Sequence, residues 1–413
     1  MRMSQLFTKT SKTAPADEVA KNAQLLIRAG FVYKEMAGVY AYLPLGKRVL
    51  DNIIQIIREE MNAIGGNEVS MTALQSRETW ELSGRWDDEV MDVWFKTRLA
   101  NGTELGLAPT HEEPLTKLMK NFISSYKDLP VYPYQFQIKF RNELRSKSGL
   151  MRGREFWMKD LYSFSRTQEE HDAFYEIVTE AYHKVYDRLG IGDITYKTFA
   201  SGGSFSKFSH EFQTLSPVGE DIIYVHKEKR IAINEEVYTD EVLADLGVTR
   251  EELTEEKAVE VGNIFTLGTK YSDALDLTFT DVDGESKKVI MGSYGIGPSR
   301  LMGLLAEHFA DDKGLVWPES VAPYKVHLVS LGESGSRQAD ELYDELNEQQ
   351  IEVLYDDRNE RPGVKFADAE LMGMPWRVTV SDRLVEARQV ELTNRTSGET
   401  KLLTVQELLA ILK

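Results

Sequence analysis

The chain has 413 residues, of which 42% are hydrophobic, 10% aromatic and 28% charged, a composition typical of a globular protein and a length too great for one core. It has no cysteine and seven histidines, which excludes disulfide scaffolds, thiol nucleophiles and cysteine-ligated metal sites. The 67 acidic and 49 basic side chains give a net charge of −18, which argues against indiscriminate binding to nucleic acid but not against a local basic patch. No apolar window is long enough to span a membrane and the N-terminus carries no signal or transit pattern, so we expect a cytoplasmic protein with no membrane partner.

The first predicted elements are two amphipathic helices at 17–30 and 49–65, each ending at glycine. A polar group follows at 110–113, where Thr-His-Glu-Glu lies between two prolines. One interpretation is a helix start, with Thr110 as the N-cap and Glu113 at the third position. The other is a binding loop, in which Thr110 and Glu112 accept hydrogen bonds from a substrate ammonium group. The two interpretations are compatible.

Residues 131–144 alternate between apolar and polar side chains, which predicts a strand of an antiparallel sheet. Its polar face is either solvated or the floor of a polar ligand site. A basic loop at 145–153 and a strand-like run at 154–164 complete a hairpin. This hairpin concentrates positive charge in an otherwise acidic chain, through Arg141, Arg145, Lys147, Arg152 and Arg154.

A third amphipathic helix is predicted at 168–189. Residues 226–260 are charge-rich and poor in large apolar groups, so we expect a surface connector with short helices and no core of its own; Thr249 and Glu252 suit a capping box there. The stretch 263–291 is strand-rich with a turn at 281–286, and then a glycine-rich bend leads to Pro298 at a helix start. From 317 onward strands and helices alternate, which indicates a separate, mainly parallel α/β domain.

The residues that could bind a nucleotide are arginines, acids and an aromatic ring. The GxSxG, P-loop and kinase motifs are missing from the sequence. Arg141, Arg152 and Arg300 could instead make three separate contacts to a triphosphate, since guanidinium forks bind phosphate and carboxylate in pairs of hydrogen bonds. Glu143 and Glu260 could hold an adenine amino group or Mg²⁺, and a base could stack on the ring of Phe156. Such an inventory suits acyl-adenylate formation, which needs positioning and charge stabilisation more than a general base.

The order of these motifs resembles one family. KFRNE (139–143), PTHEE (109–113), VGNIFTLG (261–268), GIGPSR (295–300) and DDRNERPGVKF (356–366) are similar to segments of bacterial-type prolyl-tRNA synthetases, which are class II aminoacyl-tRNA synthetases. The resemblance covers nearly the whole chain, in a short form that lacks the inserted editing domain. It implies an α+β catalytic domain over 1–316, built on an antiparallel sheet flanked by helices, with 226–260 in place of the insertion. It also implies an α/β anticodon-binding domain over 317–413.

The resemblance further implies a proline–tRNA ligase that uses ATP and Mg²⁺, binds L-proline and tRNA(Pro), forms a homodimer and leaves editing to a free-standing protein. Arg141 and Arg300 would be the catalytic residues, and Mg²⁺ would arrive with ATP, with Glu260 as its protein contact and no dedicated metal site. The other implied contacts are with proline (Thr110, Glu112, Arg141, Phe265), with ATP (Arg141, Glu143, Arg152, Phe156, Glu260, Asn263, Arg300) and with anticodon guanines (Arg358, Lys365).

Three positions depart from the family pattern: Thr72 replaces a proline, Asn263 a histidine and Ser293 a cysteine. From Pro323 onward there are 11 Lys and Arg against 17 Asp and Glu, so any grip on tRNA there must be local. Two alternatives remain, a synthetase-like protein without catalysis and a class II enzyme for another amino acid such as threonine. The first tends to lose the three arginines, and the second needs a cysteine-ligated zinc ion.

Overall fold

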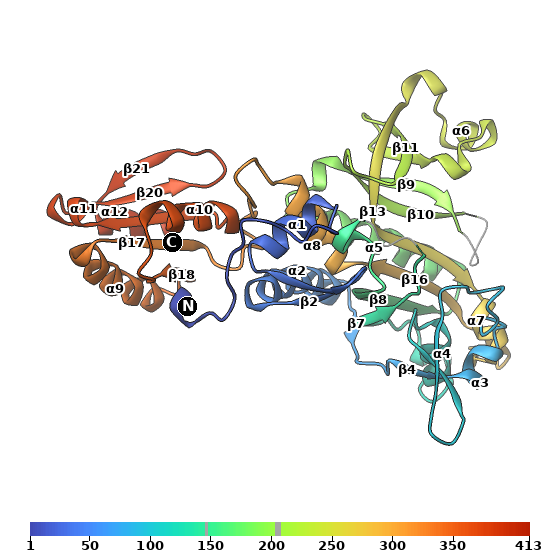
Figure 1. The fold of residues 1–413 in the computed structure, drawn as a ribbon. Coiled ribbons are helices and arrows are strands. Elements are labelled where there is room, and N and C mark those ends of the chain that lie inside the picture. Colours follow the sequence, from blue (N-terminus) through green and yellow to red (C-terminus); the bar gives the residue numbers. More distant parts are fainter. Residues whose placement is uncertain (145–147, 203–207) are drawn as a thin grey trace. The chain divides into compact units, whose positions relative to one another are not determined.

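The computed structural model describes residues 1–144, 148–202 and 208–413, and the chain divides into two compact units (Figure 1). One unit comprises Ile54–Ser146 and Arg152–Leu301, and the other comprises Met1–Ile53, Lys147–Met151 and Met302–Lys413. Nothing in the sequence pattern indicated that the first 53 residues pack with the C-terminal segment.

A nine-stranded sheet forms the centre of the unit of residues 54–301, counted over the described part of the chain. Its neighbouring strands are antiparallel except for two parallel pairs, β12 with β9 and β3 with β7. The strand order is β10 (Phe208–Leu215), β9 (Thr195–Ser201), β12 (Ile231–Asn234), β11 (Asp221–His226), β13 (Thr254–Gly268), β16 (Ile290–Ile296), β8 (Glu155–Ser165), β7 (Pro133–Phe140) and β3 (Asn67–Glu68).

Helix α5 (Gln168–Arg188) packs on one face of this sheet, against β8, β13 and β16. Side chains alternate between the faces of a strand, and Lys159 on β8 reaches the Tyr182 hydroxyl of α5 at 2.6 Å. The neighbours Asp160 and Tyr162 therefore lie at the opposite face. Two rows of paired residues cross that face on β13, β16 and β8: Asn263, Gly295 and Asp160 in one, and Phe265, Ser293 and Tyr162 in the next.

Smaller elements of the same unit flank the sheet. Helix α4 (Glu112–Met119) and α7 (Lys270–Ala274) pack together, and a three-stranded sheet places β6 (Glu104–Leu107) between β4 (Leu74–Ser76) and β5 (Phe95–Arg98). Helix α3 (Arg77–Glu81) adjoins this small sheet. Its Trp80 forms one buried cluster with Trp86 and Trp94. A hairpin of β14 (Thr278–Thr280) and β15 (Ser286–Lys288) confirms the predicted turn at 281–286.

The segment 226–260 is more structured than its composition indicated. Strands β11 and β12, helix α6 (Asp240–Leu246) and the start of β13 form a lobe that continues from the main sheet (Figure 1). Ile233, Val237, Val242, Leu243 and Val248 are buried together there. The prediction that this segment has no core is therefore wrong, because few but well-spaced aliphatic residues suffice to cover one small helix. The capping box of Thr249 and Glu252 is confirmed.

The second unit contains a five-stranded sheet that is half parallel. Strand β17 (Val326–Leu331) pairs in parallel with β18 (Val353–Asp356) and β19 (Trp376–Ser381), and β20 (Val390–Asn394) and β21 (Thr400–Leu403) continue antiparallel. Helix α9 (Glu333–Glu348) and α10 (Pro362–Met372) lie on opposite sides of this sheet in Figure 1. Helix α11 (Asp382–Glu386) and α12 (Val405–Leu412) complete an α/β arrangement. The predicted α/β class is confirmed, but the sheet is not mainly parallel, because the two pairings of β20 are antiparallel.

The N-terminal residues of this unit form α1 (Lys21–Arg28), the hairpin of β1 (Val32–Met36) and β2 (Val39–Tyr42), and the start of α2 (Pro44–Ala63). Phe31 stacks on Trp317 with ring centroids 5.6 Å apart. The guanidinium of Arg48 donates to the carbonyl of Pro323 at 2.6 Å.

Helix α8 (Pro298–His308) begins at Pro298 as predicted. No helix in the described ranges is long and apolar enough to cross a membrane.

Candidate active site

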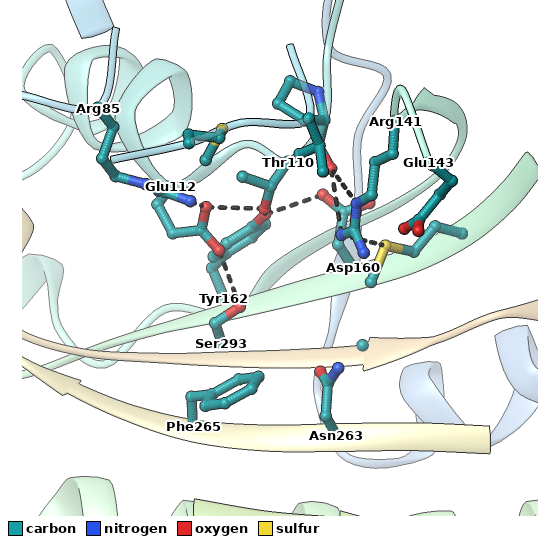
Figure 2. Close-up of a pocket in the computed structure, with 15 residues that line it drawn as sticks. Arg85, Thr110, Glu112, Arg141, Glu143, Asp160, Tyr162, Asn263, Phe265 and Ser293 are labelled. Atoms are coloured by element: carbon teal, nitrogen blue, oxygen red, sulfur yellow. Dashed lines mark hydrogen bonds and ion pairs between the residues drawn. The ribbon is translucent and has the colours of Figure 1, made fainter. Parts of the chain in front are cut away.

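A cavity of about 280 Å³ opens on the sheet face opposite α5 (Figure 2). The two rows of β13, β16 and β8 form its floor. Gly295 keeps this floor open, because a Cβ there would lie 2.6 Å from Met158 and 2.8 Å from Asn263. The described residues that line the cavity are Arg85, Met91, Val93, Pro109, Thr110, Glu112, Arg141, Glu143, Met158, Asp160, Tyr162, Asn263, Phe265, Ser293 and Gly295.

One end of the cavity presents hydrogen-bond acceptors. The Thr110 hydroxyl donates to Glu112 Oε2 at 2.7 Å, and the Ser293 hydroxyl donates to Glu112 Oε1 at 3.2 Å. Glu112 is buried, and Arg85 lies 3.3 Å from its Oε2 atom. The predicted helix start is displaced by one residue, since His111 is the N-cap of α4 and Thr110 caps nothing with its side chain. The alternative interpretation of Thr110 and Glu112 as a binding pair agrees with this geometry.

Glu113, the predicted third residue of a capping box, is buried in an ion pair instead. Its carboxylate accepts from Arg85 at 3.1 Å and from the Ser83 hydroxyl at 2.6 Å. Burial raises the pKa of Glu113 to about 7, although the charge of Arg85 opposes this shift. Arg85 also donates to the Tyr271 hydroxyl at 2.8 Å. This buried group fixes the start of α4, and with it the position of Glu112.

The other end of the cavity is cationic. Arg141 follows β7, and its Nε and Nη2 atoms both lie 3.3 Å from the carbonyl oxygen of Pro109. Its guanidinium lies over the Phe156 ring at 5.3 Å. Burial lowers the pKa of Arg141, and the positive charge of Arg300 lowers it further. Two neighbouring guanidinium groups in a partly buried cleft create a strong positive potential, which suits a polyanionic ligand.

Arg300, in the first turn of α8, reaches the residues of β13. Its Nη1 atom donates to the Glu260 carbonyl at 2.6 Å and to Glu260 Oε2 at 3.0 Å, and Asn263 donates to Glu260 Oε1 at 2.9 Å. Burial acts to raise the pKa of Glu260, but Arg300, Asn263 and Arg141 together outweigh it and the pKa lies below its usual range. On the paired strand β10, burial and then the charge of Glu260 raise the pKa of Glu211 to about 8.

Arg152 approaches from the basic loop. Its guanidinium donates to Glu143 at 3.1 Å and to Glu220 at 2.8 Å. Glu143 itself lines the cavity beside Arg141 (Figure 2). Thus three arginines from separate segments approach one cleft. Arg141 lines it, Arg152 contacts the lining residue Glu143, and Arg300 contacts Glu260, which is bonded to the lining residue Asn263. Arg145 and Lys147 lie outside the described residues.

Most of the residues predicted from the sequence gather around this cavity, and two lie elsewhere. Arg358, after β18, forms ion pairs with Asp356 at 2.6 Å and with Asp368 at 2.8 Å. Lys365 on α10 is buried and donates to the carbonyl oxygens of Ser330 and Asp356 at 2.9 and 3.0 Å. Both residues are engaged inside the C-terminal fold.

Sequence reasoning missed Arg85, Asp160 and Tyr162. The last two lie on β8 in the run KDLYSF. The signal available in the sequence was the spacing: an acid two residues before a tyrosine in a predicted strand places both side chains on the same face. Arg85 stands in SGRW, next to one of the clustered tryptophans. A buried charge among aromatic residues requires a partner, which is the signal that could have linked Arg85 to the acids at 112 and 113.

Comparison with known proteins matches two families to two successive parts of the chain. The family described as the tRNA synthetase class II core domain (G, H, P, S and T) matches residues 95–309, and an anticodon binding domain matches residues 325–413. A proline–tRNA ligase of Anaplasma marginale is 39% identical over 427 residues, with 99% of each chain covered. One of Hyphomonas neptunium is 38% identical over 441 residues, with both chains covered completely.

Solved structures show the same fold. A prolyl-tRNA synthetase from Cryptosporidium parvum, complexed with L-proline and AMP, superposes with a TM-score of 0.75 at 19% identity, covering 94% of this chain and 72% of that one. The fold and the matched core domain define a class II aminoacyl-tRNA synthetase. Within that class the chain belongs to the family of proline–tRNA ligases, which it matches over nearly its whole length.

Proposed function

We propose that this protein joins L-proline to tRNA(Pro) in two steps, with ATP as the energy source. In the first step a carboxylate oxygen of proline attacks the α-phosphorus of ATP; the new C–O–P linkage forms, the bond to the β-phosphate breaks, and pyrophosphate leaves. In the second step a terminal hydroxyl of the tRNA attacks the prolyl carbonyl and AMP leaves. The observation that carries this proposal is one cleft with the acceptors Thr110 and Glu112 at one end and the guanidinium of Arg141 at the other.

The geometry suggests a division of labour within the cleft. Arg141 lines the cationic end of the cavity, where it could bind both the proline carboxylate and the α-phosphate and stabilise the negative charge that spreads as the bond breaks. Arg152 and Arg300 approach from separate elements and would hold the terminal phosphates. Glu143 would accept from the adenine amino group, with Phe156 as the stacking ring. Thr110 and Glu112 would receive the two N–H groups of the proline ammonium, and Phe265 would contact its ring.

We also propose that Mg²⁺ enters with ATP and binds Glu260 together with Glu211. Glu211 carries a raised pKa of about 8 because it is buried beside Glu260, and a divalent cation would relieve that repulsion. A bound Mg²⁺ would neutralise charge on the phosphates. Arg300, which already pairs with Glu260, would orient that carboxylate.

For tRNA binding we propose a second cavity, of about 180 Å³, on the α10 side of the C-terminal sheet. Arg377 of β19, Arg395 after β20 and the buried His327 of β17 line it. Neither ring nitrogen of His327 has a hydrogen-bond partner among the described residues, nor do the Nε atoms of the two arginines. Buried donors without partners suit a ligand rich in acceptors, such as an unstacked base. Arg377 and Arg395 also form ion pairs, with Glu370 and Asp311, but they line an open cavity. Lys365 is buried and Arg358 is held by two carboxylates, so we place the anticodon contact at this cavity instead.

Family membership supports three further proposals: that the enzyme is a homodimer, that it works in the cytoplasm, and that a free-standing protein edits mischarged tRNA. The homodimer is tested by the molar mass in solution.

Proline-dependent exchange of labelled pyrophosphate into ATP tests the central proposal directly. The purified protein should catalyse this exchange with proline and not with threonine. No exchange with proline, in a protein that is folded and binds ATP, would instead support a synthetase-like protein without catalysis.

A further inference from the structure

A chain of buried polar contacts runs behind the acceptor end of the cleft, and the proposed function leaves its role open. It begins at Glu112 and Thr110, passes the Tyr162 hydroxyl 3.4 Å from Thr110, and reaches Asp160 at a further 3.0 Å (Figure 2). Both Tyr162 and Asp160 are almost completely buried. They lie in adjacent floor rows of β8 and line the cavity themselves.

The far end of this chain is a buried ion pair. Asp160 Oδ2 accepts from Lys139, Gln135 and Tyr162, each at 3.0 Å. Lys139 also donates to Nδ1 of His111 at 2.6 Å, and Nε2 of the same ring lies 3.0 Å from the Thr72 carbonyl oxygen. Burial and the charge of Lys139 lower the pKa of His111 to about 4, so this ring is neutral at pH 7. Asp160 is ionised, because Lys139 and these hydrogen bonds outweigh the effect of burial and its pKa lies below the usual value.

The ionised Asp160 fixes the direction of every proton in the chain. The Tyr162 hydroxyl has one proton and donates it to Asp160, while its oxygen accepts from the backbone N–H of His111 at 3.0 Å. Burial and the charge of Asp160 raise the pKa of Tyr162 well above its usual value, so this proton stays in place at neutral pH. The Thr110 hydroxyl also has one proton, which it donates to Glu112.

No proton therefore lies between Thr110 and Tyr162, and the oxygen of Thr110 keeps its lone pairs for a donor in the cleft. If Asp160 were uncharged, the Tyr162 proton could turn toward Thr110. If Tyr162 were absent, the Thr110 hydroxyl could turn away from Glu112. Either change would weaken an acceptor pair that the cleft presents to its ligand.

We propose that Tyr162 and Asp160 are positioning residues, which hold Thr110 and Glu112 as a pair of hydrogen-bond acceptors for the two N–H groups of the proline ammonium. This inference rests on the proposed function, since it deepens the amino-acid end of that same cleft. Neither residue takes part in bond making or breaking. Their effect is to favour a protonated amine that presents two N–H groups and to disfavour a ring of the same shape without N–H groups.

The variant Tyr162→Phe tests this inference in the exchange assay. The apparent KM for proline should rise about tenfold or more, as expected when a hydrogen bond to a charged group is weakened. The KM for ATP should change less than about twofold. Tetrahydrofuran-2-carboxylate, in which an oxygen replaces the ring nitrogen, should inhibit wild type and variant with the same Ki, because it brings no N–H to Thr110. A purely structural defect would weaken proline and this analogue alike.

Tyr182→Phe is the matched control. It removes an equally buried tyrosine hydroxyl that accepts from the buried Lys159, on the other face of the same strand. It should cost similar stability without raising the KM for proline. Asp160→Asn, which keeps Tyr162, is the second variant and should raise the KM for proline in the same way.

The outcomes distinguish the ligase function from the positioning role of Tyr162 and Asp160. Wild-type protein without proline-dependent exchange would contradict the proposed function itself. Active wild type together with an unchanged proline KM in both folded variants, or with parallel losses for proline and the analogue, would overturn the positioning role alone. Failure of both variants to fold would assign the buried chain to stability and would overturn it as well.

Discussion

At the scale of single residues, the cleft brings together guanidinium groups that repel each other. Arg141 and Arg300 are near enough that the charge of one lowers the pKa of the other, which costs free energy in the empty protein. That cost is recovered when a polyanion binds between them. Arg300→Gln should therefore reduce the exchange rate about 100-fold and raise the KM for ATP, because it removes donors aimed at developing phosphate charge.

Arg188→Gln is a suitable control for that measurement. Arg188 on α5 also pairs with two carboxylates, those of Glu59 and Glu60, but at the exposed surface of the other sheet face. Surface pairs of this kind contribute little, so exchange should be unaffected. Wild-type exchange kinetics in the Arg300→Gln protein would show that Arg300 does not act on ATP.

The charged residues of the site could be proposed from the sequence, whereas the buried residues that orient them could not. Arg141, Glu143 and Arg300 stand in short polar or glycine-rich segments whose composition already suggests anion binding. Asp160 and Tyr162 lie in a strand that reads as ordinary core. Their role depends on Lys139 and His111, which reach them only through the pairing of β7 with β8 and the position of α4. Such tertiary proximity has no local sequence signal.

At the scale of elements, alternation predicted β7 and the polarity of its faces, but not how deeply the polar face is buried. Gln135 and Lys139 are almost inaccessible, because Met71 packs against Gln135 and His111, the N-cap of α4, packs against Lys139. The lobe at 226–260 was underestimated for a related reason. Its apolar residues are too sparse to show a periodic pattern, and their burial depends on strands β9 and β13 beside them.

The pairing of β10 with β13 leads to a pH-dependent prediction at Glu211. Its pKa is about 8 in the folded protein against an ordinary value of 4.5. Between these values the folded state keeps a proton that the unfolded state has released, so stability falls as the pH rises from about 4.5 to about 8. Glu211→Gln removes this dependence. At pH 8.5 its Tm should exceed that of wild type by at least about 2 °C, and the difference should shrink toward pH 5.

The same variant tests the proposed metal contact. If Glu211 shares Mg²⁺ with Glu260, Glu211→Gln should need more Mg²⁺ for half-maximal exchange even though the protein is more stable at high pH. Glu176→Gln, an exposed carboxylate on α5 paired with Lys197, is the control and should change neither property. An unaltered Mg²⁺ requirement would limit Glu211 to a structural role.

At the scale of the whole molecule, amino-acid activation and tRNA binding should be separable by mutation. The C-terminal segment is acidic overall, so its contact with RNA must be local, and Arg377 is the candidate in the second cavity. Arg377→Ala should raise the KM for tRNA(Pro) in aminoacylation and reduce the salt dependence of binding by about one charge, while pyrophosphate exchange stays at the wild-type rate.

Arg337→Ala provides the comparison, because this exposed arginine lies on α9, across the sheet from α10. Equal tRNA kinetics in the two variants would place the anticodon contact elsewhere. Loss of exchange in Arg377→Ala, with an unchanged Tm, would show that the two activities are not separable.

The absence of a large insertion between the KFRNE segment (139–143) and the GIGPSR segment (295–300) predicts how the enzyme handles alanine. Alanine has a primary rather than a secondary ammonium, but two of its N–H groups and its carboxylate can take the places of those of proline. Because alanine is also smaller, the cleft rejects it chiefly through lost apolar contact. Each missing methylene is worth about 1–3 kcal/mol, or about 10- to 200-fold in kcat/KM. Alanine-dependent exchange should therefore be measurable. Alanyl-tRNA(Pro) incubated with the purified enzyme should persist as long as in buffer, and its hydrolysis by the enzyme alone would show that the lobe at 226–260, or another part of the chain, performs the editing.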